Sequence, residues 1–312
     1  MNKKTIPTLK LFSKYSFFIF LVVISTYYIK NYSTIFMPKE YKTIKKIVDK
    51  IASKNYLGDE EIPFSVGSGA YMEYETEKLG LCKKDDCYYF KNLNPYKKHK
   101  DFKKVDLNEL SKQSYLYNSI EAYAWSGVVW LSKSTFKTYG DKTNYLGCII
   151  AHELSHIIYN DHLEQSIKLS KKIKDIQVLK DEKNKELNKE ELNKEELNKE
   201  ELKKEEDEKK DLFEKVLSRE SEIKADQNGA KMMINAGYSK NTCLKSIKFL
   251  SKKNYLDAHT ELKSTHPGHI ERYKSLKTFI DSYDKEVKTL KPYKWSWKYN
   301  RNLNTLTFSP QK

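Results

Sequence analysis

The feature that most constrains this chain is an H-E-x-x-H motif, formed by His152, Glu153 and His156. Residues four positions apart share one face of a helix, so both imidazoles can reach one metal ion with Glu153 beside it. The residues around the motif are mostly aliphatic, which favours a buried helix over 144–163. We therefore interpret the two histidines as metal ligands and not as solvated side chains on a surface helix.

A zinc site of this kind needs a third protein ligand and leaves the fourth position for water. Glu222 and Asp226 are four residues apart, so a helix would point both carboxylates at one centre. Glu222 can bind the metal, while Asp226 can accept the free ring N–H of a ligand histidine and fix its orientation.

His162 is the alternative third ligand, as in the pattern H-E-x-x-H-x-x-G-x-x-H. That pattern places a glycine where this chain has Tyr159, and tyrosine resists the positive φ of the turn. Asn160 could turn the chain, but one residue out of register. The sequence therefore favours Glu222 over His162.

Four segments resemble, in the same order, the gluzincin metallopeptidase family of bacterial HtpX and the CAAX prenyl endopeptidase, including its periplasmic members. They are E-A-Y-A-W-S-G at 121–127, the H-E-x-x-H motif, S-R-x-x-E-x-x-A-D at 218–226 and S-T-H-P-G-H-I-E-R at 264–272. The first segment departs from the family's N-A-F-A-x-x-G, because Glu121 stands where asparagine is usual.

The resemblance implies a zinc endopeptidase with one Zn²⁺ per chain, acting on protein or peptide substrates. His152, His156 and Glu222 would hold the metal, and Glu153 would be the general base. By the same resemblance, His266 is a candidate catalytic residue that donates a hydrogen bond to the oxyanion. A rival of another class keeps the same ligands, namely a zinc-binding assembly factor or chaperone-like module with little proteolysis.

The expected fold is α+β, a mainly helical zincin-type metallopeptidase domain with a small β-sheet at the cleft edge, preceded by one N-terminal hydrophobic segment. Residues 38–60 and 107–120 have helical patterns, and residues 62–76 suggest short strands. We expect a strand over 123–131, ahead of the metal helix, where an extended peptide could pair its backbone.

We divide the chain into six segments. They are a basic segment (1–14), a transmembrane signal anchor or signal peptide (15–37), the first part of the peptidase domain (38–180), a charged repeat helical insertion (181–211), the second part of the domain (212–285) and a C-terminal tail (286–312).

The N-terminal segment has no charged residue between Tyr15 and Ile29 and follows four lysines. As a helix this run spans about 22 Å, short of the roughly 30 Å of a bilayer core. A short signal anchor is favoured over a signal peptide cleaved after Ser25, because the A-x-A form is absent. Either way we expect an extracytoplasmic domain, membrane-anchored or secreted.

The chain has 55 lysines and only three arginines, Arg219, Arg272 and Arg301. Two of them fall inside the motifs above, where lysine cannot replace a planar, bidentate donor. We therefore expect Arg219 and Arg272 to act as structural clamps near the site, with carboxylates as partners. The net charge of +15 is nearly all dispersed lysine without a recognised motif, so no nucleic-acid partner is predicted.

The four cysteines fall into two groups. Cys82 and Cys87 close a short loop and predict a disulfide, with a second zinc site as the alternative. Cys148 is most simply explained as core packing on the metal helix, and Cys243 receives no role.

The segment 186–205 repeats a five-residue unit that places glutamate and lysine at i, i+4. Its leucines form no single stripe and do not fit heptads, so a charged helix or arm is favoured over a coiled coil. The tail alternates at 294–299, which is typical of a strand that covers the domain or touches lipid headgroups.

Overall fold

The computed structural model describes residues 37–67, 76–81, 122–125, 127–186, 199–252, 258–262, 264–284 and 294–311, together with Val22, Lys83 and Asn94. The N-terminal anchor, the pair Cys82 and Cys87, the helix expected over 107–120 and Glu121 lie outside the described residues. None of the helices found in the described part has the length and apolar composition to cross a membrane.

The fold is α+β and mostly helical, with one mixed sheet of five strands. The strands are β1 (Ile62–Gly67), β2 (Ala122–Trp125), β3 (Val128–Ser132), β4 (Lys294–Asn300) and β5 (Thr305–Gln311). Their order in the sheet is β2-β3-β1-β5-β4, and only the β1–β3 pairing is parallel. β2 is the outer strand next to β3, and it also packs against the metal helix.

The single strand expected over 123–131 is wrong, since this segment forms the β2–β3 hairpin. Trp125 pairs with Val128, so only two residues connect the strands. Gly127 has a φ of 80°, a conformation that glycine adopts without a steric penalty and that short hairpin loops require.

The C-terminal tail completes the sheet. β5 pairs with β1, and its Leu306 and Phe308 side chains are fully buried. On β4, the indole N–H groups of Trp295 and Trp297 both donate to one carboxylate oxygen of Asp49, each at 2.7 Å. The tail is therefore part of the domain's core and not an appendage.

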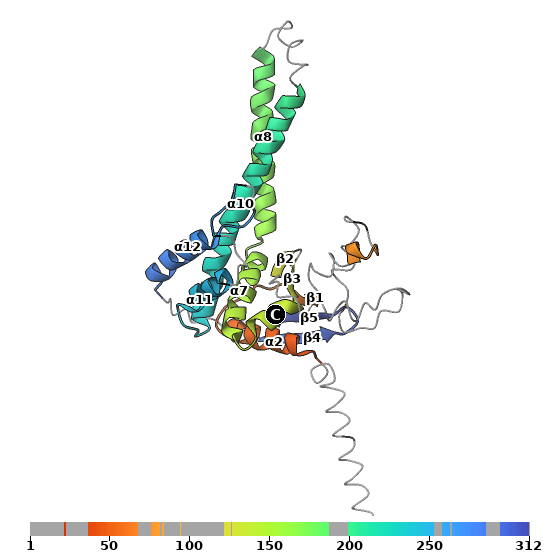
Figure 1. Ribbon diagram of the computed structural model, residues 1–312, viewed down its shortest axis with the longest axis vertical. Helices are drawn as coiled ribbons and strands as arrows, with labels where there is room; N and C mark the ends of the chain where they lie inside the picture. Colours follow the sequence, from red (N-terminus) through yellow and green to blue (C-terminus); the bar gives the residue numbers. More distant parts are fainter. Residues whose placement is uncertain are drawn as a thin grey trace, which may run out of the picture.

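Seven helices are described in enough detail to place. They are α2 (Lys39–Ala52), α6 (Lys133–Tyr139), α7 (Thr143–Ile158), α8 (Asp161–Glu186), α10 (Lys199–Asn235), α11 (Thr242–Ser251) and α12 (His269–Ser282). The central helix is α7, which contacts α2, α10, α11 and the sheet. Figure 1 shows α8 and α10 side by side, extending together away from this body as a long arm.

The interpretation of Cys148 as simple packing, and of Cys243 as without a role, is corrected by a disulfide between them. The bond joins α7 to α11 across 95 residues of sequence. Both side chains are buried, so the packing of the metal helix is reinforced covalently four residues before His152.

Candidate metal centre

The metal helix ends earlier than the sequence predicted. A helix was expected over 144–163, but α7 stops at Ile158 and α8 begins at Asp161. Asn160 lies between them with a φ of 50°, a left-handed conformation that asparagine tolerates better than most residues. The chain therefore turns directly after the motif and brings Asp161 back towards it.

The second ligand helix approaches α7 closely because of one glycine. A Cβ atom added at Gly229 would lie 2.9 Å from the backbone nitrogen of His152, too close for any side chain. Glu222 lies seven residues before Gly229, two turns along the same face of α10. The missing side chain thus lets α10 carry Glu222 within reach of both histidines.

Three side chains converge at this contact, and all three are buried. The Nε2 atoms of His152 and His156 are 3.2 Å apart. They lie 3.2 Å and 3.5 Å, respectively, from the two carboxylate oxygens of Glu222. Ligand atoms on a tetrahedral zinc ion, at metal distances of about 2.0–2.1 Å, are roughly 3.3 Å apart. The spacing of these donors therefore fits one zinc ion.

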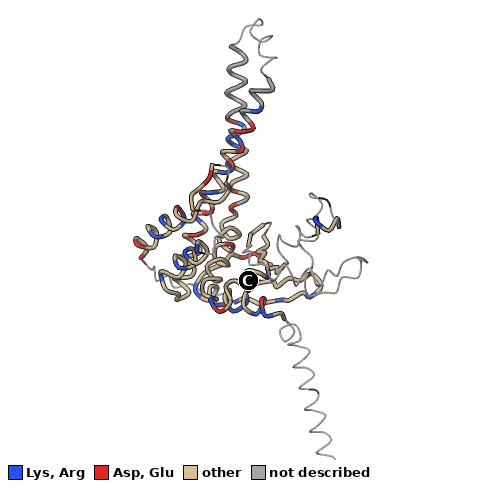
Figure 2. The backbone as a smooth tube through the Cα atoms, in the orientation of Figure 1, with Lys and Arg blue, Asp and Glu red and all other residues tan. Residues whose placement is uncertain are grey.

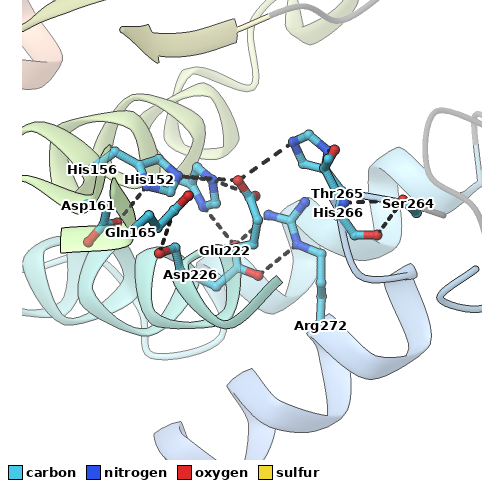
Figure 3. A network of polar contacts seen from close by, with 11 residues as sticks. His152, His156, Asp161, Gln165, Glu222, Asp226, Ser264, Thr265, His266 and Arg272 are labelled. Carbon is cyan, nitrogen blue, oxygen red and sulfur yellow. Dashed lines mark hydrogen bonds and ion pairs between the residues drawn. The ribbon is translucent and has the colours of Figure 1, made fainter. Parts of the chain in front are cut away.

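The other ring nitrogen of each histidine faces a carboxylate. His152 Nδ1 lies 3.0 Å from Asp226 Oδ1, and His156 Nδ1 lies 2.7 Å from Asp161 Oδ2 (Figure 3). An ionised carboxylate can only accept, so both Nδ1 atoms donate. In neutral rings the Nε2 lone pairs then point at each other and at Glu222, an arrangement that needs a cation between them.

Asp226 is itself held by α12. The Arg272 guanidinium donates to both oxygens of Asp226, with N–O distances of 2.7 Å and 2.6 Å. Burial alone would raise the pKa of Asp226, but Arg272 and His152 outweigh it and hold this pKa below its usual range. Asp226 therefore stays ionised and able to orient His152.

The two expected arginine clamps differ in their partners. Arg272 binds a carboxylate, as the sequence suggested. Arg219 does not, because its guanidinium donates to the backbone carbonyls of Leu262 and Ser264, at 3.2 Å and 2.8 Å. Arg219 thus ties α10 to the loop that carries His266.

The electrostatics of the ligands favour bound positive charge. Burial opposes protonation of His152, but Glu222 and Asp226 more than offset it and raise the pKa of this ring to about 10. Burial likewise opposes protonation of His156, while hydrogen bonds to Asp161 and Glu222 raise its pKa to about 9. Protons and a metal cation compete for the same Nε2 atoms.

Glu153 lies inside the same buried region, with 6 % of its surface exposed. Burial, reinforced by the charge of Glu222, raises the pKa of its carboxyl above the usual value. A raised pKa makes the carboxylate a stronger proton acceptor, which suits a general base.

His266 stands at the open side of the centre. Its Nε2 lies 3.6 Å from Glu222 Oε1, and its side chain is 63 % exposed. The Thr265 hydroxyl lies 3.0 Å from His266 Nδ1, so the ring is held on the rim and faces the ligands (Figure 3). The side chain of His162, the alternative ligand, lies outside the described residues.

Sequence reasoning missed Asp161. The carboxylate that orients His156 belongs to the residue directly after Asn160, and it is 4 % exposed. The sequence did hold a signal for this contact, because an asparagine able to turn the chain follows the motif and directly precedes Asp161. A turn at Asn160 bears on His162 and also on Asp161, which it brings back to His156.

The family model described as Peptidase family M48 matches residues 102–280, more than half of the chain and all of the metal centre. No curated protein and no solved structure matches this chain.

Proposed function

The chain belongs to peptidase family M48, and on that premise we propose that it is a zinc-dependent endopeptidase that cleaves exported or membrane-associated proteins. Membership implies protein or peptide substrates and a His-His-Glu metal site, and His152, His156 and Glu222 form such a site. The observation that carries the proposal is the convergence of two imidazole nitrogens and the Glu222 carboxylate at spacings that fit one zinc ion, backed by two orienting carboxylates.

Each buried group has a distinct task in this proposal. When bound, zinc supplies a Lewis acid that acidifies water and polarises the scissile carbonyl. Glu153 takes the proton from the attacking water and returns it to the leaving amine. His266, on the exposed rim, donates a hydrogen bond to the oxyanion that forms on the substrate carbonyl.

We expect the substrate to lie beside β2, which is the outer strand next to β3 and packs against α7. Main-chain hydrogen bonds to a strand do not read side chains, so this contact alone gives little sequence selectivity.

The test is Glu153→Gln, which removes the base and keeps the shape of the side chain. We expect zinc content to stay at one per chain and cleavage of casein to fall about 10²- to 10⁴-fold. Glu164→Gln, on an exposed residue of α8, is the matched control and should cleave like the wild type. Equal activity of Glu153→Gln would contradict the assignment of Glu153 as the base. Absence of cleavage by the zinc-loaded wild type would favour the alternative, a zinc-binding assembly factor or chaperone-like module.

We further propose that the catalytic domain is extracytoplasmic, either anchored by residues 15–37 or released after cleavage. The Cys148–Cys243 disulfide supports this, because disulfides persist mainly in oxidising compartments. When cells are lysed directly into denaturant, which exposes these buried side chains, a thiol-reactive polymer should label the two cysteines only after reduction. Labelling of both without reduction would overturn the proposal.

A further inference from the structure

A pocket of about 390 Å³ lies beside the metal centre, between the base of the arm and the hairpin. Trp125 of β2 forms one side, and α8 and α10 form two others. Thr265, directly before His266, completes it. The volume lies in the range of about 300–1,000 Å³ that is common for ligand pockets.

The pocket continues outward from the zinc ligands along both helices. Ser218 lines it and lies one turn before Glu222 on the same face of α10. Gln165 lines it as well, one turn after Asp161 on α8. A substrate held at the metal and running beside β2 would therefore pass directly over this pocket.

The register of the two helices places a leucine from each at the pocket. Gln165 Nε2 donates to Ser221 Oγ at 2.8 Å, which fixes how α8 and α10 pair. Four residues farther out on each antiparallel helix stand Leu169 and Leu217, both lining the pocket. These residues belong to the described base of the arm, on either side of the charged repeat (Figure 1).

The lining combines apolar side chains (Trp125, Leu169 and Leu217) with neutral polar ones (Gln165, Ser166, Ser218 and Thr265) and three charged ones. Trp125 exposes 63 % of its surface, which is high for a tryptophan and marks a residue able to stack on a partner. Farther out on α10 stand Asp211, Glu214 and Lys215, of which Asp211 and Lys215 pair with each other. Most of the exposed lining surface is apolar, and two of the three charged residues are acidic, so the pocket suits an apolar side chain better than an acidic one.

We propose that this pocket is a substrate subsite that takes an aromatic or long aliphatic side chain, and that the base of the α8–α10 arm sets the enzyme's sequence preference. The inference rests on the proposed peptidase function and adds a specificity determinant that the metal centre does not supply. Backbone pairing beside β2 positions the peptide, and the pocket selects among side chains.

The test compares two substitutions that add the same group one turn apart on α8. Leu169→Trp fills the pocket, whereas Ile173→Trp adds the same indole at a residue that is already 40 % exposed and does not line it. The substrates are quenched fluorogenic peptides in which one position at a time is Phe or Ala around the cleaved bond. Zinc content reports that each variant is folded.

We expect wild type to prefer Phe over Ala at one position by about tenfold or more in kcat/KM. Leu169→Trp should reduce that ratio to near one, and Ile173→Trp should keep it. A wild type without preference for a large apolar side chain, or a Leu169→Trp variant with the wild-type ratio, would overturn the subsite.

Direct binding separates failure of the subsite from failure of the peptidase. The Kd values of the Phe and Ala peptides are measured by fluorescence anisotropy with zinc-loaded Glu153→Gln, alone and combined with Leu169→Trp. If zinc-loaded wild type cleaves no peptide, the proposed function fails, and the Kd ratio then decides on the pocket. A ratio of about ten that Leu169→Trp abolishes supports the pocket, and a ratio near one contradicts it.

Discussion

The two halves of α10 carry the same types of charged residue but have very different surroundings. In the outer half, nearly all described side chains from Lys204 to Glu214 are exposed, and Figure 2 shows both signs of charge along it. In the inner half, Glu222 and Asp226 are buried and each has fixed partners. The same residue types thus serve as a solvated surface in one half and as a metal centre in the other.

The energies that attach to these charges differ accordingly. An i, i+4 helix pair such as Lys215 and Asp211, whose carboxylate is exposed, contributes about 0.3–0.5 kcal/mol. Removing one partner of a buried pair such as Arg272 and Asp226 costs about 3–5 kcal/mol, because the other charge stays buried and uncompensated. The number of charged residues along α10 therefore does not indicate their contribution to stability. Burial determines which carboxylates contribute most.

The largest expected effect is the pH dependence of zinc affinity at the inner half of α10. His152 and His156 have pKa values raised to about 10 and about 9, so protons oppose zinc binding below these values. Each displaced proton weakens apparent zinc affinity about tenfold per pH unit, or about 10⁴-fold for both between pH 8 and pH 6. Competition with a chromophoric chelator between pH 6 and pH 8 measures this change in zinc affinity.

The stability of the zinc-free protein should depend on pH in the opposite direction to zinc affinity. A raised histidine pKa stabilises the fold fully below the unfolded value of about 6.5, and this contribution is lost as pH rises towards about 10. Zinc affinity should therefore rise with pH while stability of the zinc-free protein falls. A flat zinc affinity between pH 6 and pH 8 would contradict the assignment of these rings as ligands.

Asp226→Ala is expected to show the next largest effect. It leaves Arg272 buried without its partner and His152 without an orienting acceptor, so unfolding free energy should fall by about 3–5 kcal/mol and zinc affinity by about 10- to 100-fold. Urea denaturation and zinc competition measure the two. Asp211→Ala, in the outer half, is the control and should change stability by less than about 0.5 kcal/mol.

Gly229→Ala tests the close approach of α10 to α7 without touching a ligand. The added methyl would meet the backbone at His152, so the helices must separate, at a cost of about 1–3 kcal/mol in stability. Zinc affinity should weaken as Glu222 is displaced. Wild-type stability and zinc affinity in this variant would contradict the claim that the close approach of α10 to α7 requires glycine at this position.

Deletion of residues 183–208, bridged by a short Gly-Ser linker, should have the smallest effect. It removes the charged repeat and leaves the pocket residues and every ligand in place. We expect zinc content to remain at one per chain, measured by atomic emission. Loss of zinc on deletion would refute the division of α10 into a functional base and a dispensable outer arm.

Each half of the site was readable from sequence because its spacing is local, whereas the pairing of Glu222 with the two histidines came from the resemblance to the gluzincin family. His152 and His156, like Glu222 and Asp226, are four apart, and helical periodicity alone places each pair on one face. Asp161 was not readable in that way, since its contact with His156 depends on the left-handed conformation of Asn160.

Other features depended on partners far away in the chain. The Cys148–Cys243 bond joins residues 95 apart, and no spacing rule connects them. The tail alternation at 294–299 predicted a strand, but not that β5 would pair with β1 and bury Phe308. Local pattern thus predicted which residues of each helix share a face at the site, whereas the hairpin, the end of α7 and the contacts between distant segments required the structure.

The most direct test of the metal centre is the zinc content of four single alanine variants, at His152, His156, His162 and Glu222. We expect one zinc per chain in the wild type and in His162→Ala, and loss of zinc in the other three. A His162→Ala variant that loses zinc, while Glu222→Ala retains it, would contradict the account and establish the alternative third ligand.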